Sequence, residues 1–342
     1  MIRLASTLFA SEPGTRIGID HGALMARSIS GSKTRVPMEG IEGVVLIGGS
    51  SITSEAIARC VRSGVRVASL TRSGRVRFVC SPPTSGNVHL RIGQLRLADR
   101  PGEALEVARW VVAGKLNNSI RLARRWLYDA QPEERQGIGN AVEGLVSALG
   151  RVQGASTGDH LRGVEGTGAR WSFRAMSLAV SRLGDPFSMQ RRSRRPPGDP
   201  LNATLGFGYG ILVSELSSAA DVVGLDPQVG FLHGVRSGRP SLALDLLEEF
   251  RAPLVDRFVV GALRRRQITL QHFVETPGGA WFLTDDGRRL FLDLFEEFRA
   301  GDVPHDLLGR DVPRWSLPVL QATIMARYLR GDLPAYVPWQ AR

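Results

Sequence analysis

Residues 81–87, with the sequence SPPTSGN, separate two parts of the chain that differ in their hydrophobic pattern. Paired prolines and a glycine interrupt both the alternation of a strand and the 3.6-residue period of a helix. A chain of 342 residues is also long enough for two domains of roughly 100–200 residues each. We therefore predict one domain over residues 1–80, a linker over residues 81–88 and a second domain over residues 89–342.

The part before this linker is rich in short runs of β-branched residues. The runs VVLI (44–47), VRVAS (65–69) and RVRFV (75–79) have the length of strands. Residues 51–62 instead carry apolar side chains at helical spacing, and Gly64 follows them as a suitable helix end. The pattern predicts a β-rich, β-sandwich-like domain that contains one helix.

The part after the linker shows helical periodicity along most of its length. Apolar residues recur with a 3.6-residue period in the segments 90–98, 103–130, 133–151, 157–182, 200–223, 240–250, 254–265, 286–299 and 314–331. Asp199 and Pro200 supply an N-cap and a first-turn proline for the segment that begins at residue 200. We therefore expect the α+β class, in which the β-rich N-terminal domain is followed by a larger all-α domain.

The chain carries an excess of positive charge. Its 44 Lys and Arg residues outnumber its 33 Asp and Glu residues, which gives a formal net charge of +11 and a pI near 10.8. Only Lys33 and Lys115 are lysines, so coding bias explains the preference for arginine, but the net excess remains. A chain this basic attracts polyanions. Because it has no basic amphipathic helix suited to a membrane surface, nucleic acid is the expected partner.

Composition excludes several other classes of protein. A hydrophobic fraction of 43% can fill a core, which excludes an intrinsically disordered chain. Cys60 and Cys80 are the only cysteines, so neither a disulfide framework nor a thiolate zinc site is available. No stretch approaches about 18 uninterrupted apolar residues and the N-terminus does not resemble a signal peptide, so we expect a soluble, cytoplasmic protein without a membrane partner.

Three acidic residues share one face of the helix predicted over 240–250. Asp245, Glu248 and Glu249 lie at positions i, i+3 and i+4, and His233 precedes the helix by a short loop. Each like-charged pair costs a few tenths of a kcal/mol unless cations gather there, and a divalent metal ion removes the conflict. From this spacing alone two interpretations stay open, namely a solvated acidic helix face with a loop histidine, or a metal site.

Glu165 lies among small residues, with Gly163, Gly166 and Gly168 around it. Glycine inside a helix costs up to ~1 kcal/mol relative to alanine, which suggests a packing or functional reason. Either another helix crosses closely here and leaves Glu165 exposed, or a nucleic-acid strand approaches the carboxylate.

Four motifs follow one another in the order found in the CRISPR-associated protein 1 family, and the chain resembles that family along nearly its whole length. The motifs are VEGTGAR (164–170), RRPPGDPLNATLGFGY (194–209), GLDPQVGFLH (224–233) and RPSLALDLLEEFR (239–251). The tail over residues 327–336 looks like the type I-C branch of the family.

The resemblance implies a metal-dependent DNA endonuclease and integrase of CRISPR adaptation. Such an enzyme joins the 3′-hydroxyl ends of short DNA fragments, the new spacers, to the CRISPR repeat by transesterification. The resemblance further implies that Glu165, His233 and Glu248 are catalytic metal ligands, and that Asp245 is an acid that can share the site. Two carboxylates and one imidazole suit Mg²⁺ or Mn²⁺.

We predict that residues around these acids bind DNA, because the acids by themselves repel phosphate. The candidates are Arg170, Arg191, Arg192, Arg194, Arg195, Asn202, Tyr209, Arg236 and Arg239. Asn202 and Tyr209 lie at i and i+7 on one helix face, where core packing explains Tyr209 equally well. Ser241 is a further candidate to orient DNA or ligands.

The sheet predicted within residues 1–80 has little helical cover of its own, and uncovered edges or faces tend to be paired. The resemblance implies a homodimer formed through this domain, with two dimers flanking a dimer of CRISPR-associated protein 2. The expected partners are therefore double-stranded DNA (spacer precursors and the CRISPR repeat), a second copy of the chain and that dimer.

Two other functions stay open on the sequence. One is a metal-dependent, structure-specific nuclease that cleaves DNA or RNA in repair. The other is a non-catalytic basic DNA-binding scaffold in which the acids are only surface charge.

Overall fold

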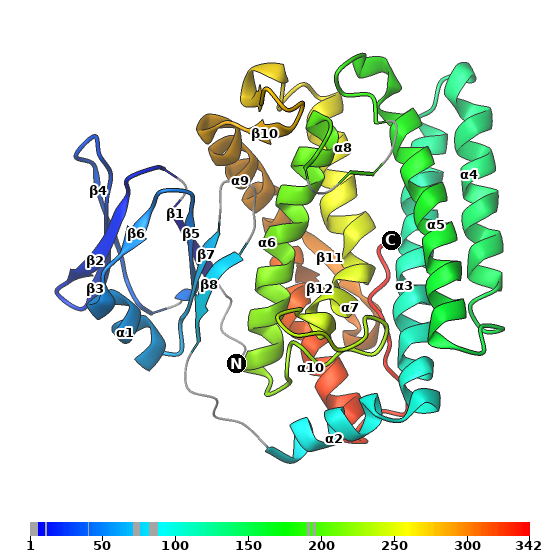
Figure 1. Ribbon diagram of the computed structural model, residues 1–342, viewed down its shortest axis with the longest axis horizontal. Helices are drawn as coiled ribbons and strands as arrows, with labels where there is room; N and C mark the ends of the chain where they lie inside the picture. The colour runs from blue at the N-terminus through cyan, green and yellow to red at the C-terminus, as the bar shows by residue number, and fades with distance from the viewer. Residues whose placement is uncertain are drawn as a thin grey trace.

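The computed structural model describes residues 6–10, 12–39, 41–70, 76–81, 88–189, 192–193 and 196–342. These residues form a smaller β-rich part and a larger helical part, which lie side by side (Figure 1). Most of the predicted linker and three of the predicted DNA-binding residues, Arg191, Arg194 and Arg195, lie outside the described residues.

Two four-stranded sheets build the N-terminal part. One has the order β1-β5-β7-β8, in which β5 is parallel to β1 and β7 and the edge strand β8 is antiparallel to β7. The other has the order β4-β3-β2-β6. The elements are β1 (Ser6–Ala10), β2 (Arg16–Asp20), β3 (Ala23–Arg27), β4 (Lys33–Val36), β5 (Ile41–Ile47), β6 (Ser51–Ile52), α1 (Ser54–Arg62), β7 (Arg66–Leu70) and β8 (Val76–Cys80).

The helices of the second part follow the predicted segments closely. They are α2 (Val88–Ala98), α3 (Pro101–Tyr128), α4 (Pro132–Gly150), α5 (Gly158–Ala179), α6 (Pro200–Val222), α7 (Ser241–Phe250), α8 (Arg257–Arg264), α9 (Asp285–Ala300) and α10 (Leu317–Leu329), with 3₁₀ turns η1 (Ser181–Leu183), η3 (Leu270–His272), η4 (Asp306–Leu308) and η5 (Arg314–Ser316). Asp199 caps α6 as predicted, because its Oδ1 accepts a hydrogen bond from the backbone N–H of Asn202 at 2.6 Å.

Two short antiparallel strand pairs interrupt the helical part, which the sequence analysis expected to be all-α. β9 (Phe273–Glu275) pairs with β10 (Trp281–Leu283), and β11 (Asp302–His305) pairs with β12 (Arg310–Pro313). These strands have three or four residues each, which is too short for an alternating pattern to stand out. The class itself, a β-rich part followed by a mostly helical part, is confirmed.

Strand β5 is buried on both faces, which explains its unbroken apolar sequence. Val44 and Leu46 belong to the core shared by the two sheets and α1, whereas Val45 and Ile47 belong to the core of the helical part. Successive side chains of a strand point to opposite faces, so one face of this sheet packs on the helices of its own chain. The prediction that the sheet has little helical cover is therefore wrong for this face, because the helical part packs on it.

A π-helical turn, η2 (Arg251–Asp256), joins α7 to α8. Pro253 lies inside this turn and has no backbone N–H to donate, which favours a local departure from the α-helix. Turns of this type are frequently found at functional sites.

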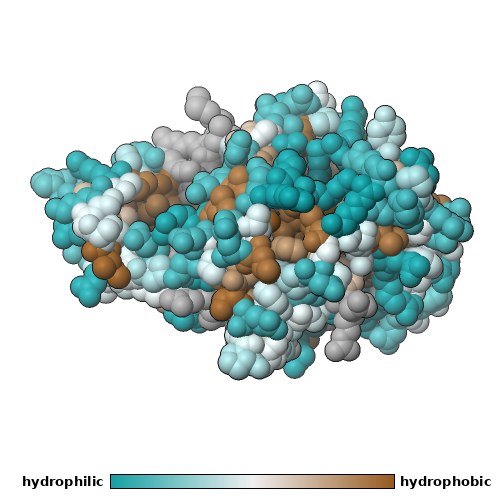
Figure 2. Space-filling model, turned by 90° about the horizontal axis from the view of Figure 1, so that it is seen from above, coloured by the Kyte–Doolittle hydropathy of each residue, from teal (hydrophilic) through white to brown (hydrophobic). Residues whose placement is uncertain are grey.

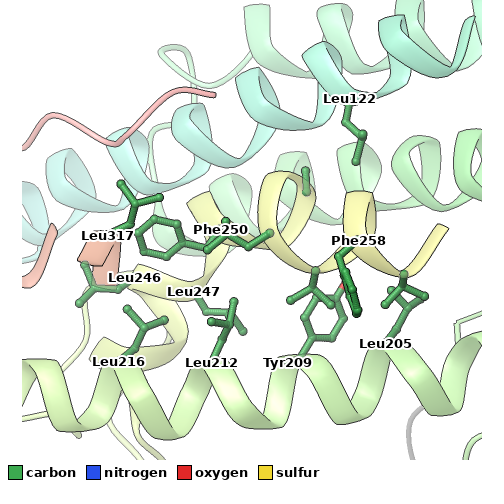
Figure 3. Packing of buried hydrophobic residues seen from close by; sticks show 14 of the residues in the cluster. Leu122, Leu205, Tyr209, Leu212, Leu216, Leu246, Leu247, Phe250, Phe258 and Leu317 are labelled. Atoms are coloured by element: carbon green, nitrogen blue, oxygen red, sulfur yellow. The ribbon is translucent and has the colours of Figure 1, made fainter. Parts of the chain in front are cut away.

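Helix α6 passes beside α7, η2 and α8. Its residues Leu205, Tyr209, Leu212 and Leu216 extend from one face toward those elements (Figure 3). Hydrophilic residues cover most of the molecular face shown in Figure 2. Among the described residues, no helix combines the length and apolar character needed to cross a membrane.

Candidate active site

A cavity of about 330 Å³ lies among α3, α5, α6, α7 and η2. Its lining residues are Lys115, Ser119, Glu165, Ala169, Ser172, Phe173, Tyr209, His233, Arg239, Leu244, Glu248, Arg251 and Asp256. The fold thus brings Glu165, His233 and Glu248 to the wall of one cavity, although they lie on different elements.

Gly168 lets α5 approach α3 closely. A Cβ atom at this position would overlap Cδ2 of the buried Leu116, whereas nothing lies within 4 Å of a Cβ atom built at Gly163 or Gly166. Of the glycines around Glu165, only Gly168 therefore makes the close helix crossing that the sequence suggested. This approach places Glu165 beside Lys115, the residue before Leu116.

Lys115 forms ion pairs with carboxylates from two helices. Its Nζ lies 2.6 Å from Oε2 of Glu248 and also contacts Oε1 of Glu165. The side chain of Glu248 is only 3% exposed and that of Lys115 is 10% exposed. Glu165 on α5, whose side chain is 24% exposed, and Glu248 on α7 therefore converge on one largely buried cation.

Arg251, at the start of η2, gives Glu248 a second cationic partner. Its Nε lies 3.0 Å from Oε2 of Glu248. Burial raises the pKa of Glu248, but Arg251, Lys115 and His233 outweigh burial and hold that pKa at about 2. Glu248 is thus a buried carboxylate that stays ionised at neutral pH.

Asp245 holds the loop that carries His233. Its two oxygens accept hydrogen bonds from the backbone N–H groups of Phe231, Leu232 and His233 at 2.6, 3.0 and 2.9 Å. Oδ1 also lies 2.7 Å from Nδ1 of His233. Because a carboxylate only accepts, Nδ1 carries the proton in this contact, which leaves Nε2 as the nitrogen that can bind a metal. Asp245 therefore positions His233, and it is not among the residues that line the cavity.

Glu249, the third acid of α7, faces the C-terminal segment of the chain. Its carboxyl oxygens accept hydrogen bonds from Tyr336 Oη at 2.5 Å, from the backbone N–H of Trp339 at 2.5 Å and from Gln321 Nε2 at 3.0 Å. The acids of α7 are 1 to 3% exposed, and each has a separate set of partners. The interpretation as a solvated acidic helix face is therefore wrong.

The donor types at the cavity suit Mg²⁺ or Mn²⁺, since Glu165 and Glu248 offer carboxylate oxygens and His233 offers Nε2. Among the described residues, no three His, Cys, Asp or Glu side chains are grouped closely enough to hold a metal ion as they stand. Glu165 and Glu248 are instead joined through Lys115.

Tyr209 and Asp256 form a buried pair beside this cluster. The hydroxyl of Tyr209 donates a hydrogen bond to Oδ1 of Asp256, and the guanidinium of Arg251 lies 4.6 Å from the centre of the tyrosine ring. Burial raises the pKa of Asp256 to about 6. Tyr209 is thus both a core residue, as its packing suggested, and part of the cavity wall.

The described candidates for DNA binding occupy different environments. Arg170 and Arg236 are exposed, and Arg239 lines the cavity while its guanidinium donates to the carbonyl oxygen of Gly234. Ser241 is buried, and its hydroxyl donates to the same carbonyl at 3.1 Å. Ser241 therefore shapes the loop instead of facing a ligand.

Asn202 lies in the core instead of at the surface. It is 1% exposed, its Oδ1 accepts from Nη1 of Arg192 at 2.6 Å, and its Nδ2 donates to Asp199 at 2.6 Å. A side chain bonded in this way has no free group for DNA, because both ends of its amide are used. Asn202 instead positions Arg192, whose guanidinium carbon lies 5.6 Å from the centre of the Tyr209 ring.

Three residues of the cavity wall, Lys115, Arg251 and Asp256, were not predicted from the sequence to belong to the site. A signal for Lys115 was present, because it is one of two lysines in an arginine-rich chain and lies next to Leu116 on the apolar face of a long helix. Arg251 and Asp256 are the first and last residues of the π-helical turn η2, which follows the acidic helix. Their spacing in the sequence does not reveal that this turn directs both of them toward the cavity.

Comparison with known proteins identifies the family. A family model described as "CRISPR associated protein Cas1" matches residues 8–297. CRISPR-associated endonuclease Cas1 1 of Moorella thermoacetica is 35% identical over 340 residues, which cover 99% of each chain. CRISPR-associated endonuclease Cas1 2 of Rhodospirillum rubrum is 36% identical over 344 residues, with 99% of each chain covered.

Solved structures share the fold. A Cas1 protein from Thermotoga maritima superposes with a TM-score of 0.81 at 21% identity, covering 95% of this chain and 97% of that one. A casposase bound to integration product superposes with a TM-score of 0.84 at 24% identity, covering 98% and 92%. With a family model that spans most of its length and full-length relatives above one-third identity, this chain belongs to the CRISPR-associated Cas1 family.

Proposed function

We propose that this protein is a metal-dependent DNA endonuclease and integrase, which joins the 3′-hydroxyl ends of short DNA fragments to a CRISPR repeat by transesterification. The observation that carries the proposal is the convergence of Glu165 and Glu248 on one cationic group, in the cavity that His233 also lines. Full-length relatives named CRISPR-associated endonucleases support the class of reaction.

Glu165, His233 and Glu248 would hold one Mg²⁺ or Mn²⁺ ion, and Asp245 would position His233. A metal ion held there supplies charge stabilisation to phosphate oxygens. Two carboxylates balance the charge of a divalent ion, while the contact of Asp245 with Nδ1 fixes the imidazole.

The cations of the cavity would bind and orient the phosphodiester of the repeat. Arg239 and Arg251 line the cavity, and Arg170 and Arg236 are exposed on elements that carry the site. In the reaction, the 3′-oxygen of the fragment forms a new P–O bond and the P–O bond to the 3′-oxygen of the repeat breaks. The proton lost by the attacking hydroxyl is balanced by one gained by the leaving oxygen, so no nucleotide triphosphate is consumed.

A non-catalytic scaffold is the weaker proposal. Surface acids on such a protein serve solubility, but Glu248 is 3% exposed and yet ionised, with two cations bound to it. A buried charge is costly unless it is paired, which fits a built site better than a solvated surface.

The proposal includes a homodimer formed through the N-terminal part and a dimer of CRISPR-associated protein 2. One solved structure of the same fold is a Cas6-RT-Cas1–Cas2 complex. On β8, an edge strand, Phe78 and Val79 are 42% and 37% exposed, and apolar edge strands tend to be covered.

The division at residues 81–88, the type I-C branch and the cytoplasmic location stay predictions from the sequence.

Integration into a supercoiled plasmid that carries a repeat tests the proposal. A labelled duplex with 3′-hydroxyl ends is incubated with the plasmid, the protein, CRISPR-associated protein 2 and Mn²⁺ or Mg²⁺. We expect label in the plasmid with the wild-type protein, and none after chelation or with Glu165→Gln or His233→Ala. The matched control is Glu133→Gln, an exposed acid on α4, which should integrate as the wild type does. Undiminished integration by the His233 variant would contradict the proposal.

A further inference from the structure

Lys115 stands out by its residue type. The chain has 44 basic Lys and Arg residues, and all except Lys33 and Lys115 are arginines. Lys33 is exposed on β4, whereas Lys115 lies in the middle of α3, buried beside Val112 and Leu116. A lysine ammonium is a compact point charge, whereas an arginine guanidinium is a planar fork that needs more space. The smaller cation is thus found where two carboxylates contact the same charged group.

The contacts of Lys115 involve both carboxylates that the proposed function assigns to the metal. Nζ contacts Oε1 of Glu165 and lies 2.6 Å from Oε2 of Glu248. Two carboxylates that face each other repel unless a cation lies between them. In this arrangement the ammonium group does for the carboxylates what a metal ion does, since it neutralises them and holds them together.

Local charge indicates that a metal ion and this ammonium group exclude each other. Two carboxylates, Glu165 and Glu248, are matched by two cations, Lys115 and Arg251. A divalent ion bound to the same two carboxylates would lie beside the ammonium group of Lys115, and like charges at such short distance repel. Of the two carboxylates, Arg251 is paired with Glu248, whereas Lys115 is paired with both, so Lys115 is the group that a metal ion bound between them would replace.

His233 does not depend on Lys115 for its position. Its ring is held by Asp245, and its backbone N–H is held by the same carboxylate at 2.9 Å. The imidazole ligand is therefore fixed independently, while the two carboxylate ligands are held by a group that a metal ion can replace.

We infer that Lys115 is a built-in counter-ion of the metal site, which holds Glu165 and Glu248 together in the metal-free protein and competes with the metal ion for them. This inference rests on the proposed function. Lys115 is a positioning residue in this account. Its presence weakens metal binding and stabilises the protein when the metal is absent.

Calorimetric titration of the full-length protein with Mn²⁺, without DNA, tests this inference together with thermal unfolding in a chelator. Lys115→Met should bind Mn²⁺ about tenfold more tightly, because a charge adjacent to the ion is removed. Its unfolding temperature in chelator should fall below that of the wild type, and Mn²⁺ should recover most of the difference. Lys33→Met, the same substitution at the exposed lysine, should change neither measurement.

Two results separate this inference from the proposed function. If Mn²⁺ binds the wild type, fails to bind His233→Ala, and binds Lys115→Met no more tightly than the wild type, the inference is overturned while the proposed function stands. If Mn²⁺ binds none of the proteins, both are overturned.

A double variant covers the case in which Lys115→Met folds poorly. Lys115→Met with Glu165→Gln removes one of the facing charges, so it should unfold in chelator at a higher temperature than Lys115→Met alone. An equal or lower unfolding temperature would show that Lys115 does not serve to relieve the carboxylate repulsion.

Discussion

Tyr336 donates a hydrogen bond to Glu249 at 2.5 Å, which ties the C-terminal end of the chain to the helix that carries Glu248. On α3, Asn118 holds the same segment, because its Nδ2 donates to the carbonyl oxygen of Trp339 at 2.9 Å. The C-terminal segment therefore connects the two helices from which Lys115 and Glu248 enter the cavity.

Glu249 should make the stability of the protein depend on pH. Burial raises the pKa of Glu249 from 4.5 to about 8, although hydrogen bonds from Tyr336, Trp339 and Gln321 act in the opposite direction. Between these values the folded protein holds a proton that the unfolded chain has released, so the free energy of unfolding falls as the pH rises from 4.5 to 8.

The size of this effect is on the order of a few kcal/mol over the whole window. In Glu249→Gln, which cannot ionise, the curve of unfolding free energy against pH should be flatter from pH 5 to pH 8, as measured by urea denaturation. A slope as steep as that of the wild type would show that another group titrates there.

Asp245→Asn should weaken metal binding without removing a proposed ligand. An amide cannot accept all four hydrogen bonds that the carboxylate receives from residues 231–233, so His233 loses its fixed orientation. We expect Mn²⁺ affinity to fall about 10–100-fold, as for other groups that orient a ligand. Asp226→Asn on the preceding loop is the control and should bind Mn²⁺ as the wild type does. Equal affinities in the two variants would contradict the positioning role.

Gly166 and Gly168 both lie close to Glu165 in the sequence, but replacing each by alanine should change the stability of the protein differently. Gly168→Ala should lose about 1–3 kcal/mol of stability, because the added methyl group meets Leu116 where α5 crosses α3. Gly166→Ala should be neutral or gain up to ~1 kcal/mol, since its position is open and alanine favours a helix. Thermal unfolding of both variants measures this, and equal losses would mean that the crossing is not limited by Gly168.

Arg170 and Arg236 should each contribute to the salt dependence of DNA binding. Removing one arginine that binds a phosphate should reduce the slope of log affinity against log salt concentration by ~0.9. Arg170→Gln and Arg236→Gln should therefore both flatten the slope, as measured by fluorescence anisotropy. Arg66→Gln is the control, because its guanidinium is already paired with Asp221 at 2.6 Å. Unchanged slopes in the two test variants would show that DNA binds to other residues.

Much of the helical part could be predicted from sequence because its helices are long and end at clear signals. The segment predicted over 200–223 is α6 (Pro200–Val222), with Asp199 as its cap. By contrast, β2 and β3 were not predicted. They are joined through His21 and Gly22, whose positive φ angles of 46° and 79° form a tight turn, and five-residue strands give too few positions for a clear alternation.

The contacts between side chains of the site could not be predicted, because they depend on how helices that are far apart in the sequence pack on one another. The spacing of Asp245, Glu248 and Glu249 places them on one side of a helix, but each acid meets a different neighbour. Lys115 lies 50 residues from Glu165 in sequence, and only the packing of α3 on α5 brings them together. Residue types thus indicated the chemistry, whereas tertiary packing assigned the roles.

The central claim is that strand transfer, which needs a free 3′-hydroxyl, takes place at Glu165, His233 and Glu248. Its most direct test compares a labelled duplex ending in 3′-hydroxyl groups with the same duplex ending in 3′-deoxy groups, in the plasmid assay with Mn²⁺. The account predicts covalent joining of the 3′-hydroxyl duplex only, and none with Glu165→Gln or Glu248→Gln. Joining that persists in those variants, or plasmid cutting that is equal for both duplexes and never yields a joined product, would contradict it.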